Sequence, residues 1–326
     1  MATKIEKILV FTSGGDAPGM NACIRAVVRT AYYNGIEVYG AIKGYEGMID
    51  GNIIKLENED VANIIHRGGT ILQSARSARF REKEWRSKAY EQIKQKGING
   101  IVAIGGDGTF TGASIFGSEF DIPMVGVPGT IDNDLYGTDK TIGYDSALNT
   151  AMEAIDKIRD TANSHQRLFL VEVMGRDAGF LALRSGIAGG AIGVLVPETS
   201  GDKEKLFETL RKGWNRTRKS MIAIVAEGEG DGAMAIAEDI KVQFPNYDTK
   251  VSILGHMQRG GNPTCGDRVL ASQMGLAAVE GLMAGKDKVM TGLVGLEIEF
   301  VPLDQSIKHH KDLSTELVRM VDILAS

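Results

Sequence analysis

Short apolar runs recur along the chain, and this feature most restricts the fold that the chain can adopt. They show no alternation of polar and apolar residues, which is typical of strands covered on both faces. The runs lie at 8–11, 38–42, 101–104, 124–127, 168–171, 194–196, 221–225 and 251–254. Residues 24, 27, 28 and 31, and then 148, 151, 155 and 158, are apolar with the spacing of a helix face. Strands that alternate with helices predict parallel sheets covered by helices, an α/β fold.

The strand and helix pattern begins again after a polar turn at residues 135–140, which leads into a long helix. A domain boundary is therefore predicted after Asp134, although no sequence repeat is visible. The segments 228–232 and 244–248 are rich in turn-forming residues and are predicted to be surface turns.

The composition excludes several classes of protein. With 326 residues, 43% of them hydrophobic, the chain is long enough for two domains or one large one. Its net charge of −5 argues against a nucleic-acid or anionic-membrane partner. Only two cysteines occur, there is no apolar run of membrane-spanning length, and the first residues do not resemble a signal peptide. We therefore expect a small-molecule enzyme of the cytoplasm, with neither nucleic acid nor membrane as a partner.

Glycine-rich turns with carboxylates follow two of the predicted strands. The turn Gly105-Gly-Asp-Gly-Thr109 follows one, and Pro128-Gly-Thr-Ile-Asp-Asn-Asp134 follows the other. Phosphoryl transfer needs bare backbone against a polyphosphate, one carboxylate to hold magnesium and another to take a hydroxyl proton. A third turn, Thr12 to Gly19, opens a helix and is suited to bind an anion. Each turn alone also fits an ordinary tight turn, but together they favour phosphoryl transfer.

Basic residues cluster beside other strand ends. Arg67 and Arg76 flank a glycine pair in a polar loop, and His256 and Arg259 follow a strand, although a lone histidine is more often structural. Arg167 precedes the strand at 168–171 and Arg176 follows it, so the two should lie at opposite edges of one sheet. This placement suggests a site shared across a subunit interface.

These residues resemble the bacterial ATP-dependent 6-phosphofructokinases over nearly the whole chain, except for about the last two dozen residues. The matching motifs lie at 12–21, 67–70, 104–109, 128–134, 164–167, 173–176 and 254–261. The resemblance implies two Rossmann-like three-layer domains with mostly parallel sheets. Residues 1–142 plus about 257–305 would bind ATP, and residues 143–256 plus about 306–326 would bind fructose 6-phosphate.

The resemblance also implies a glycolytic reaction, in which the γ-phosphoryl group of MgATP passes to the 1-hydroxyl of fructose 6-phosphate. Asp132 would be the general base, and Asp134, Thr130, Arg76 and Arg176 would assist. The residues implied for ATP are Gly15, Tyr45, Arg76, Ser77, Gly106, Asp107, Gly108 and Thr109, with Asp107 carrying Mg²⁺. Those implied for the sugar phosphate are Thr130, Ile131, Asp132, Arg167, Met174, Gly175, Arg176, Glu227, Lys250, His256, Met257, Gln258 and Arg259. Arg167 and Lys250 would reach in from a neighbouring subunit of a homotetramer.

Some positions carry further expectations. Relatives that use pyrophosphate have aspartate at position 108 and lysine at position 129, so Gly108 and Gly129 indicate ATP. Lys250 stands where the family usually has arginine, which predicts a weaker grip on the 6-phosphate. The implied effector residues are Arg25, Arg29, Arg159, Gly190, Arg216, Arg218 and Lys219. Asn58, Asn63 and Ile192 depart from the family there, which predicts blunted or altered activation by ADP.

Two rival interpretations differ in kind. NAD and lipid kinases also contain Gly-Gly-Asp-Gly-Thr, but the motifs at 128–134 and 254–261 are not expected of them. A nucleotide-sensing subunit without catalysis would be expected to lose Asp107 or Asp132, and the chain has both.

Overall fold

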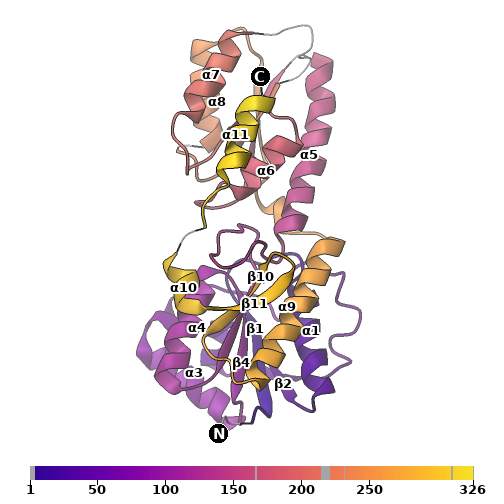
Figure 1. Cartoon of the computed structure of the whole chain (residues 1–326), viewed down its shortest axis with the longest axis vertical. Helices are drawn as coiled ribbons and strands as arrows, with labels where there is room; N and C mark the ends of the chain where they lie inside the picture. Colours follow the sequence, from indigo (N-terminus) through magenta and orange to yellow (C-terminus); the bar gives the residue numbers. More distant parts are fainter. Residues whose placement is uncertain (1–3, 166, 214–220, 231, 310, 326) are drawn as a thin grey trace. The chain divides into compact units, whose positions relative to one another are not determined.

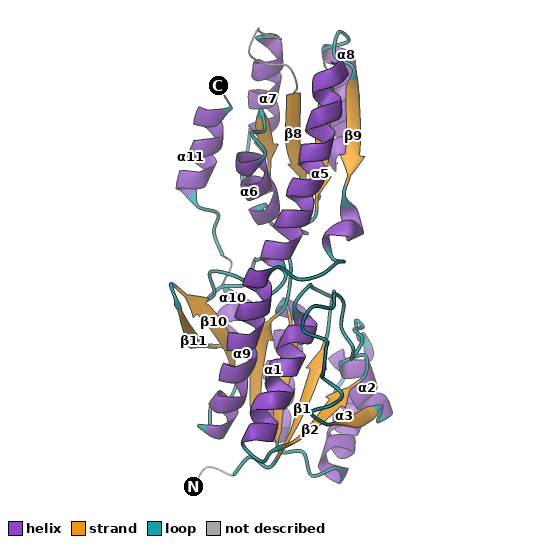
Figure 2. Ribbon diagram, turned by 90° about the vertical axis from the view of Figure 1, so that its right-hand side faces the viewer, coloured by secondary structure: helices purple, strands orange, loops and turns teal. Residues whose placement is uncertain are grey.

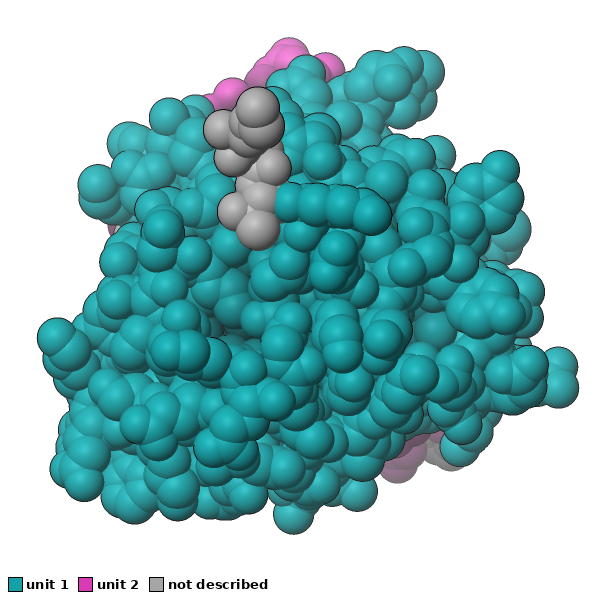
Figure 3. All heavy atoms as spheres, turned by 90° about the horizontal axis from the view of Figure 1, so that it is seen from below, with its two compact units in different colours: residues 1–131, 135–145, 259–311 teal, residues 132–134, 146–258, 312–326 magenta. Residues whose placement is uncertain are grey.

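The computed structural model describes residues 4–165, 167–213, 221–230, 232–309 and 311–325, and the chain divides into two compact units. Unit 1 comprises residues 1–131, 135–145 and 259–311, and unit 2 comprises residues 132–134, 146–258 and 312–326 (Figure 3). The chain therefore passes between the units several times, first between Ile131 and Asp132. No described helix is both long and apolar enough to cross a membrane.

Unit 1 is built on a seven-stranded sheet with the order β11-β10-β5-β4-β1-β2-β3. The five central strands are parallel, whereas β3 and β11 each run antiparallel to their neighbour at the edges. The strands are β1 (Lys7–Thr12), β2 (Glu37–Ala41), β3 (Ile53–Leu56), β4 (Gly100–Gly105), β5 (Met124–Pro128), β10 (Val289–Val294) and β11 (Glu297–Pro302). Thr12 pairs with Ile104 and Gly105 with Pro128. The carboxyl ends of β1, β4 and β5 thus lie side by side.

Helices cover both faces of this sheet (Figure 1). They are α1 (Met20–Tyr33), α2 (Tyr45–Asp50), α3 (Lys83–Gln95), α4 (Asp107–Phe120), α9 (Cys265–Met283) and α10 (Leu303–Lys308), with a 3-10 turn η1 (Arg79–Arg81). Leu9 and Phe11 of β1 point to one face, where they join a core with apolar residues of α2, α3 and α4. The helices α1 and α9 pack against each other on the opposite face (Figure 2). Alternate residues of the buried strands thus serve two cores.

Unit 2 is built on a four-stranded, fully parallel sheet with the order β7-β8-β6-β9. Its strands are β6 (Leu168–Val173), β7 (Gly193–Leu195), β8 (Met221–Ala226) and β9 (Thr249–Ile253). The helices are α5 (Tyr144–His165), α6 (Phe180–Ala188), α7 (Asp202–Arg211), α8 (Gly232–Gln243) and α11 (Thr315–Leu324), with a 3-10 turn η2 (Gly255–Gln258). A core beneath α7 and α8 joins them to β6 and β8. The α/β class with two mostly parallel sheets is therefore confirmed.

All eight apolar runs fall in or overlap strands, but the prediction missed β3, β10 and β11. These strands lie in the antiparallel edge pairs, where partly exposed strands lack a continuous apolar run. The segment 244–248 does turn, and Pro245, Asn246 and Asp248 are exposed as predicted, but the two aromatic residues point inward. Phe244 and Tyr247 are 9% and 5% exposed and belong to the core of unit 2.

Candidate active site

The turn between β1 and α1 exposes backbone in its middle, at Gly15, whereas the first residues of α1 are buried. Gly14 and Gly19 have φ of +88° and +108°, a region that glycine adopts without strain. Gly19 stands at the N-cap position without a side-chain cap and is buried, and a β-carbon on it would come 2.7 Å from Cγ2 of Ile142. A β-carbon on Gly15 would come 2.5 Å from Nη1 of Arg259. The same Nη1 donates to the Asp16 carbonyl at 3.2 Å, which brings an arginine to this turn.

The turn after β4 places a carboxylate at the start of a second helix. Asp107 is the first residue of α4, and both Asp107 and Gly108 are exposed. A β-carbon on Gly108 would meet nothing within 4 Å. Thr109 is buried and donates to the Ser13 carbonyl at 3.2 Å, which ties this turn to the one after β1. Exposed backbone and a helix N-terminus make this turn suited to phosphate.

The turn after β5 carries the next candidate residues. Gly129 donates to the Gly105 carbonyl at 3.0 Å, and the Thr130 carbonyl accepts from Thr141 Oγ1 at 2.6 Å. A β-carbon on Gly129 would come 3.0 Å from Ile104 Cγ2, so a larger residue there requires its neighbours to move. Ile131 is fully buried and is the last residue of this stretch of unit 1.

Asp132, Asn133 and Asp134 follow directly in sequence and are assigned to unit 2. Asp132 and Asn133 are each 3% exposed, and Asn133 has φ of +56°. Asp134 is partly exposed. Because Asp132 is buried, its carboxylate is shielded from bulk water.

The loop at residues 67–76 is held by side chains from the first turn and from α1. Asn21 donates through Nδ2 to the carbonyls of Arg67 and Gly68, at 3.0 and 3.1 Å, and accepts from the Ile71 amide at 2.7 Å. Thr12 donates to the Gln73 carbonyl at 2.8 Å. The guanidinium of Arg76 is exposed and has no hydrogen bond or ion pair among the described residues. The loop backbone is thus fixed, while this arginine is available to a ligand.

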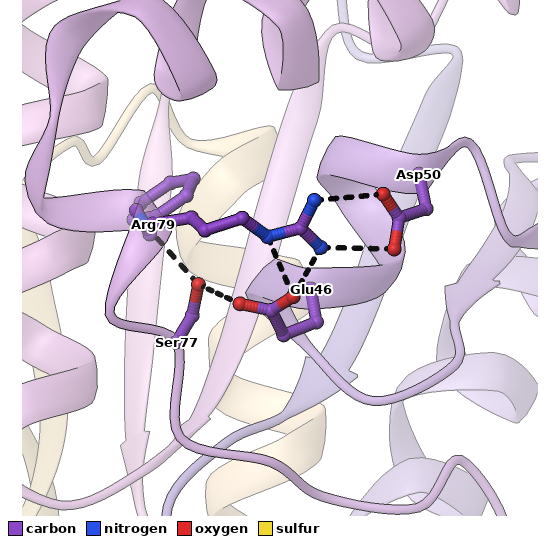
Figure 4. Close-up of polar contacts among 5 residues, drawn as sticks. Glu46, Asp50, Ser77 and Arg79 are labelled. Atoms are coloured by element: carbon purple, nitrogen blue, oxygen red, sulfur yellow. Dashed lines mark hydrogen bonds and ion pairs between the residues drawn. The ribbon is translucent and has the colours of Figure 1, made fainter.

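Two residues implied for ATP are partly or wholly withdrawn from the surface. Tyr45 is 4% exposed, stacks on Phe80 at 3.9 Å between ring centroids, and donates to the Thr109 carbonyl at 2.6 Å. Burial raises the pKa of its hydroxyl, so it stays protonated. Ser77 is partly buried and donates to Glu46 (Figure 4). Tyr45 therefore supports the turn after β4 from within the core.

In unit 2, one group of candidates gathers where β6 and β8 end. The carboxylate of Glu227 accepts from the amides of Gly175 and Arg176, at 3.2 and 2.6 Å. Arg176 has φ of +53° and is exposed. The Met174 amide donates to Oε1 of the fully buried Gln258 at 2.8 Å. His256 and Met257, also in η2, are exposed.

A second group lies at the opposite end of β6. Arg167 immediately precedes this strand. Lys250, on the neighbouring β9, pairs in register with Phe169 near the start of β6. Both cations contact Asp248, each at 2.6 Å. Hydrogen bonds from Lys250 and then Arg167 hold the pKa of Asp248 below its ordinary value. Within one copy of unit 2, these two cations and Arg176 therefore lie at opposite ends of β6.

The implied effector residues are divided between the units. Arg25 and Arg29 are one turn apart on α1 of unit 1, and burial followed by the charge of Arg29 lowers the pKa of Arg25. Arg159 of unit 2 donates to the Gly189 carbonyl next to Gly190, which has φ of +57°. Ile192 is 8% exposed, and Asn63 has φ of +55°. Arg216, Arg218 and Lys219 lie outside the described residues.

The sequence analysis did not predict two local features. Asp267 is 1% exposed and accepts from the Gly143 amide at 3.0 Å, while Thr264 caps its helix. The pattern Thr-x-x-Asp at 264–267 resembles a capping box and could have revealed the start of α9. Arg79 contacts both Glu46 and Asp50, which no local motif indicates because the partners are about thirty residues away in sequence.

Magnesium would need only a small contribution from the protein. No group of three or more potential metal-ligating side chains occurs among the described residues. Mg²⁺ bound with a nucleotide usually takes one or two carboxylates and otherwise phosphate oxygens and water. The exposed Asp107, beside bare backbone at Gly108, fits that requirement.

Known proteins resemble this chain along its length. The profile of the family described as Phosphofructokinase matches residues 7–282. The ATP-dependent 6-phosphofructokinase of Cytophaga hutchinsonii is 54% identical over 321 residues, which cover 98% of each protein.

Solved structures give the same family. The phosphofructokinase of Saccharomyces cerevisiae superposes with a TM-score of 0.86 at 38% identity over 98% of this chain. This chain spans 48% of the yeast chain, about half its length. A pyrophosphate-dependent phosphofructokinase from Marinobacter aquaeolei shares the fold, with a TM-score of 0.84 at 24% identity over 99% of this chain and 92% of its own. A shared fold therefore does not decide the phosphoryl donor.

Proposed function

The chain belongs to the phosphofructokinase family, and on that premise we propose that it acts as an ATP-dependent 6-phosphofructokinase of glycolysis. The γ-phosphoryl group of ATP passes to the 1-hydroxyl of D-fructose 6-phosphate, giving ADP and fructose 1,6-bisphosphate. One observation carries the proposal most: three glycine-rich turns end adjacent parallel strands, and one of them begins a helix with Asp107. Ligands of open α/β sheets bind beyond the carboxyl ends of strands.

Unit 1 supplies the groups for the nucleotide. The backbone around Gly15, and the N-terminus of α4 at Gly106 to Thr109, offer N–H groups to the phosphates. Asp107 would hold Mg²⁺, which neutralises charge on the phosphates when bound. The available guanidinium of Arg76 would stabilise negative charge on the phosphoryl group in transit, together with Thr130.

Asp132 takes the proton of the 1-hydroxyl as its oxygen attacks the γ-phosphorus. Its burial, at 3% exposure, keeps bulk water from competing with the substrate hydroxyl for the carboxylate. Asp134 and Ile131 complete the motif. A base of this kind contributes about 10² to 10⁴ in rate, so Asp132→Asn is expected to lower kcat by about that factor.

Unit 2 supplies the groups for the sugar phosphate. Met174, Gly175, Arg176 and Glu227 form one compact cluster after β6 and β8, and His256, Met257 and Gln258 follow β9. Arg259, adjacent in sequence, belongs to unit 1. Arg167 and Lys250 lie at the other end of β6, so we propose that they serve the site of a neighbouring subunit in a homotetramer.

A coupled assay for fructose 1,6-bisphosphate tests the function directly. The protein is given fructose 6-phosphate with either MgATP or magnesium pyrophosphate, and Asp132→Asn is measured beside it. Turnover with ATP alone, lost in the variant, supports the donor, the acceptor and the base together. Turnover with pyrophosphate contradicts the argument from Gly108 and Gly129. No turnover with either donor, by protein that still binds ATP, favours the sensing subunit.

Regulation follows from the effector positions. The family's magnesium-holding glutamate is replaced by Ile192, a buried apolar residue. Loss of that carboxylate should weaken the binding of a magnesium nucleotide more than the binding of a simple anion. We expect weak or altered activation by ADP in a rate titration at subsaturating fructose 6-phosphate. Full activation by ADP contradicts this expectation.

A further inference from the structure

We propose that Glu46, Asp50, Ser77 and Arg79, called here the Arg79 cluster, form a positioning device that sets Arg76 for phosphoryl transfer (Figure 4). All four residues belong to unit 1. The inference rests on the proposed function, because it assigns how one group of that reaction is held. Of the four, the resemblance implies only Ser77 for ATP, and Glu46, Asp50 and Arg79 are not assumed to touch either substrate.

The guanidinium of Arg79 joins two carboxylates of α2. Its Nε donates to Glu46 Oε2 at 3.0 Å, and its Nη2 donates to the same oxygen. On its other edge, Nη1 and Nη2 donate to the two oxygens of Asp50 at 3.1 and 2.9 Å (Figure 4). The planar fork of arginine allows these contacts to form at once, which lysine cannot reproduce. Arg79 therefore fastens the start of η1 to α2.

Glu46 extends the cluster to the residue next to Arg76. Its second oxygen accepts from the Ser77 hydroxyl, and Ser77 Oγ in turn accepts from the Phe80 amide at 3.1 Å. Phe80 is 4% exposed and stacks on Tyr45. The segment from Ser77 to Phe80 is thus fixed by polar contacts above a buried ring.

The other side of Arg76 is anchored separately. Ser74 donates to the Gly14 carbonyl, and Ser13 Oγ donates to the Ala75 carbonyl at 3.4 Å. Arg76 stands between these two anchors, and its own guanidinium is exposed without a described partner. Because the backbone is held on both sides of Arg76, only the freedom of its side chain remains to be lost when the guanidinium meets a phosphoryl group. This juxtaposition is the observation that carries the inference.

The charges of the Arg79 cluster support a positioning role and not a role in binding an anion. Hydrogen bonding to Arg79 holds the pKa values of Glu46 and Asp50 below their ordinary range, so both carboxylates are ionised near neutral pH. Arg79 also lies over the Trp85 ring, 5.0 Å from its centroid. Because Arg79 is neutralised by two carboxylates, it does not compete with Arg76 for an anionic ligand.

A double-mutant cycle tests the inference. Arg79→Ala, Arg76→Ala and the double variant are assayed with MgATP and fructose 6-phosphate. We expect Arg79→Ala to lower kcat about tenfold with the KM for fructose 6-phosphate little changed, because a small misplacement of a reacting group has large kinetic effects. In the Arg76→Ala background, removing Arg79 should have almost no further effect, since there is no guanidinium left to position. Additive effects, or an unchanged kcat in Arg79→Ala, overturn the inference.

Two milder variants distinguish a loss of positioning from a failure of Arg79→Ala to fold. Asp50→Asn leaves the Glu46 contacts intact and should lower kcat about twofold to threefold, and Arg79→Lys should fall between wild type and Arg79→Ala. Lys55→Gln is the matched control, because it removes one cation of the same unit from exposed pairs with Glu37 and Glu57. It should leave kcat unchanged, and an equal loss there overturns the inference. If the unmodified protein does not phosphorylate fructose 6-phosphate at all, the proposed function fails instead.

Discussion

The two units differ in how they arrange their candidate residues. In unit 1 the turns after β1, β4 and β5 lie at one edge of one sheet, because these strands are neighbours in register. In unit 2 the candidates lie at both ends of β6, with Arg176 after the strand and Arg167 before it. Six residues of strand span roughly 20 Å, at about 3.3 Å each. No small ligand within one copy of unit 2 can contact both arginines through their strand positions.

This difference suggests that the candidate sites of the two units are assembled in different ways, one within a single chain and the other between two chains. Unit 1 brings its glycine-rich turns together by strand pairing within one chain, so we expect its function to respond to local changes of shape and charge. Unit 2 presents two separate cationic surfaces, so its function should depend on association with a second copy. The predictions below test that contrast.

The largest effect is expected at Gly108 in unit 1. A carboxylate at this exposed position, beside Asp107 at the start of α4, would repel and crowd a nucleotide phosphate. Because a β-carbon at Gly108 meets nothing within 4 Å, Gly108→Asp should fold normally. We expect its rate with MgATP to fall by about 10³ or more, an order of magnitude set by charge repulsion in the transition state.

Gly108→Ala is the control for that variant, because it adds the β-carbon without the charge. It should retain most of the activity and the same melting temperature. Equal losses in Gly108→Ala and Gly108→Asp would show that space alone matters at this turn. Normal ATP turnover in Gly108→Asp would remove the argument about donor choice.

The next effect concerns the two ends of β6. Arg167→Ala and Arg176→Ala should each lower activity by about 10², the loss typical of one charge-stabilising donor. If each site uses Arg176 from one subunit and Arg167 from another, mixing the two variants after reversible dissociation creates some intact sites. Random mixing should restore roughly a quarter of the wild-type activity.

The mixing experiment has a clear contrary result. Hybrid oligomers can be demonstrated by separation on a charge tag. If such hybrids form and activity does not recover, both arginines act within one subunit's site or outside the site. As a control, Arg176→Ala mixed with itself should stay inactive. Asp107→Asn mixed with Thr109→Ala should also recover nothing, because both residues lie in one turn of unit 1.

The sequence was most informative where strands are buried and turns are short. The runs at 8–11, 101–104 and 124–127 predicted β1, β4 and β5, since a parallel strand covered on both faces must be apolar throughout. From those strands, the placement of Asp107 in a turn just after a strand followed directly, whereas the helix that Asp107 begins was not predicted. The edge strands β3 and β11, and β10 beside β11, were missed, because their partly exposed residues carry no such run.

Other features of the site depend on contacts between distant segments. Arg79 meets Glu46 and Asp50 only because the loop before η1 packs against α2, and no periodicity in the sequence reports that packing. The resemblance implied Tyr45 for ATP. Its ring, however, is buried in the core, and its hydroxyl donates a hydrogen bond to the Thr109 carbonyl. Side-chain contacts of this kind depend on tertiary packing, which overrides local signals.

A smaller effect is expected at Lys250. Its ammonium contacts Asp248 at 2.6 Å, and it replaces an arginine of the family. Lys250→Arg restores a planar fork that can hold Asp248 and a phosphate together. The KM for fructose 6-phosphate should fall about threefold while kcat changes little. An unchanged KM would show that lysine is already sufficient here, and Lys241→Arg in the exposed pair with Glu238 is the matched control.

The smallest effect concerns Asp248 itself and is best seen in its pH dependence. Hydrogen bonds from Lys250 and Arg167 hold the pKa of Asp248 below that of an ordinary aspartate, about 4. A depressed carboxylate pKa stabilises the folded state above the unfolded pKa, and this stabilisation is lost as the pH falls through the folded pKa. Asp248→Asn should therefore lower the melting temperature slightly and constantly from pH 6 to 8, by about 1 °C, because exposed pairs contribute little. The difference should shrink as the pH falls below about 4 and should vanish only below the lowered pKa of Asp248, where the folded wild-type carboxylate also loses its charge. A difference that persists at lower pH would mean that Asp248 acts through packing, and the separation of unit 2 into two charged ends would then lose its electrostatic basis.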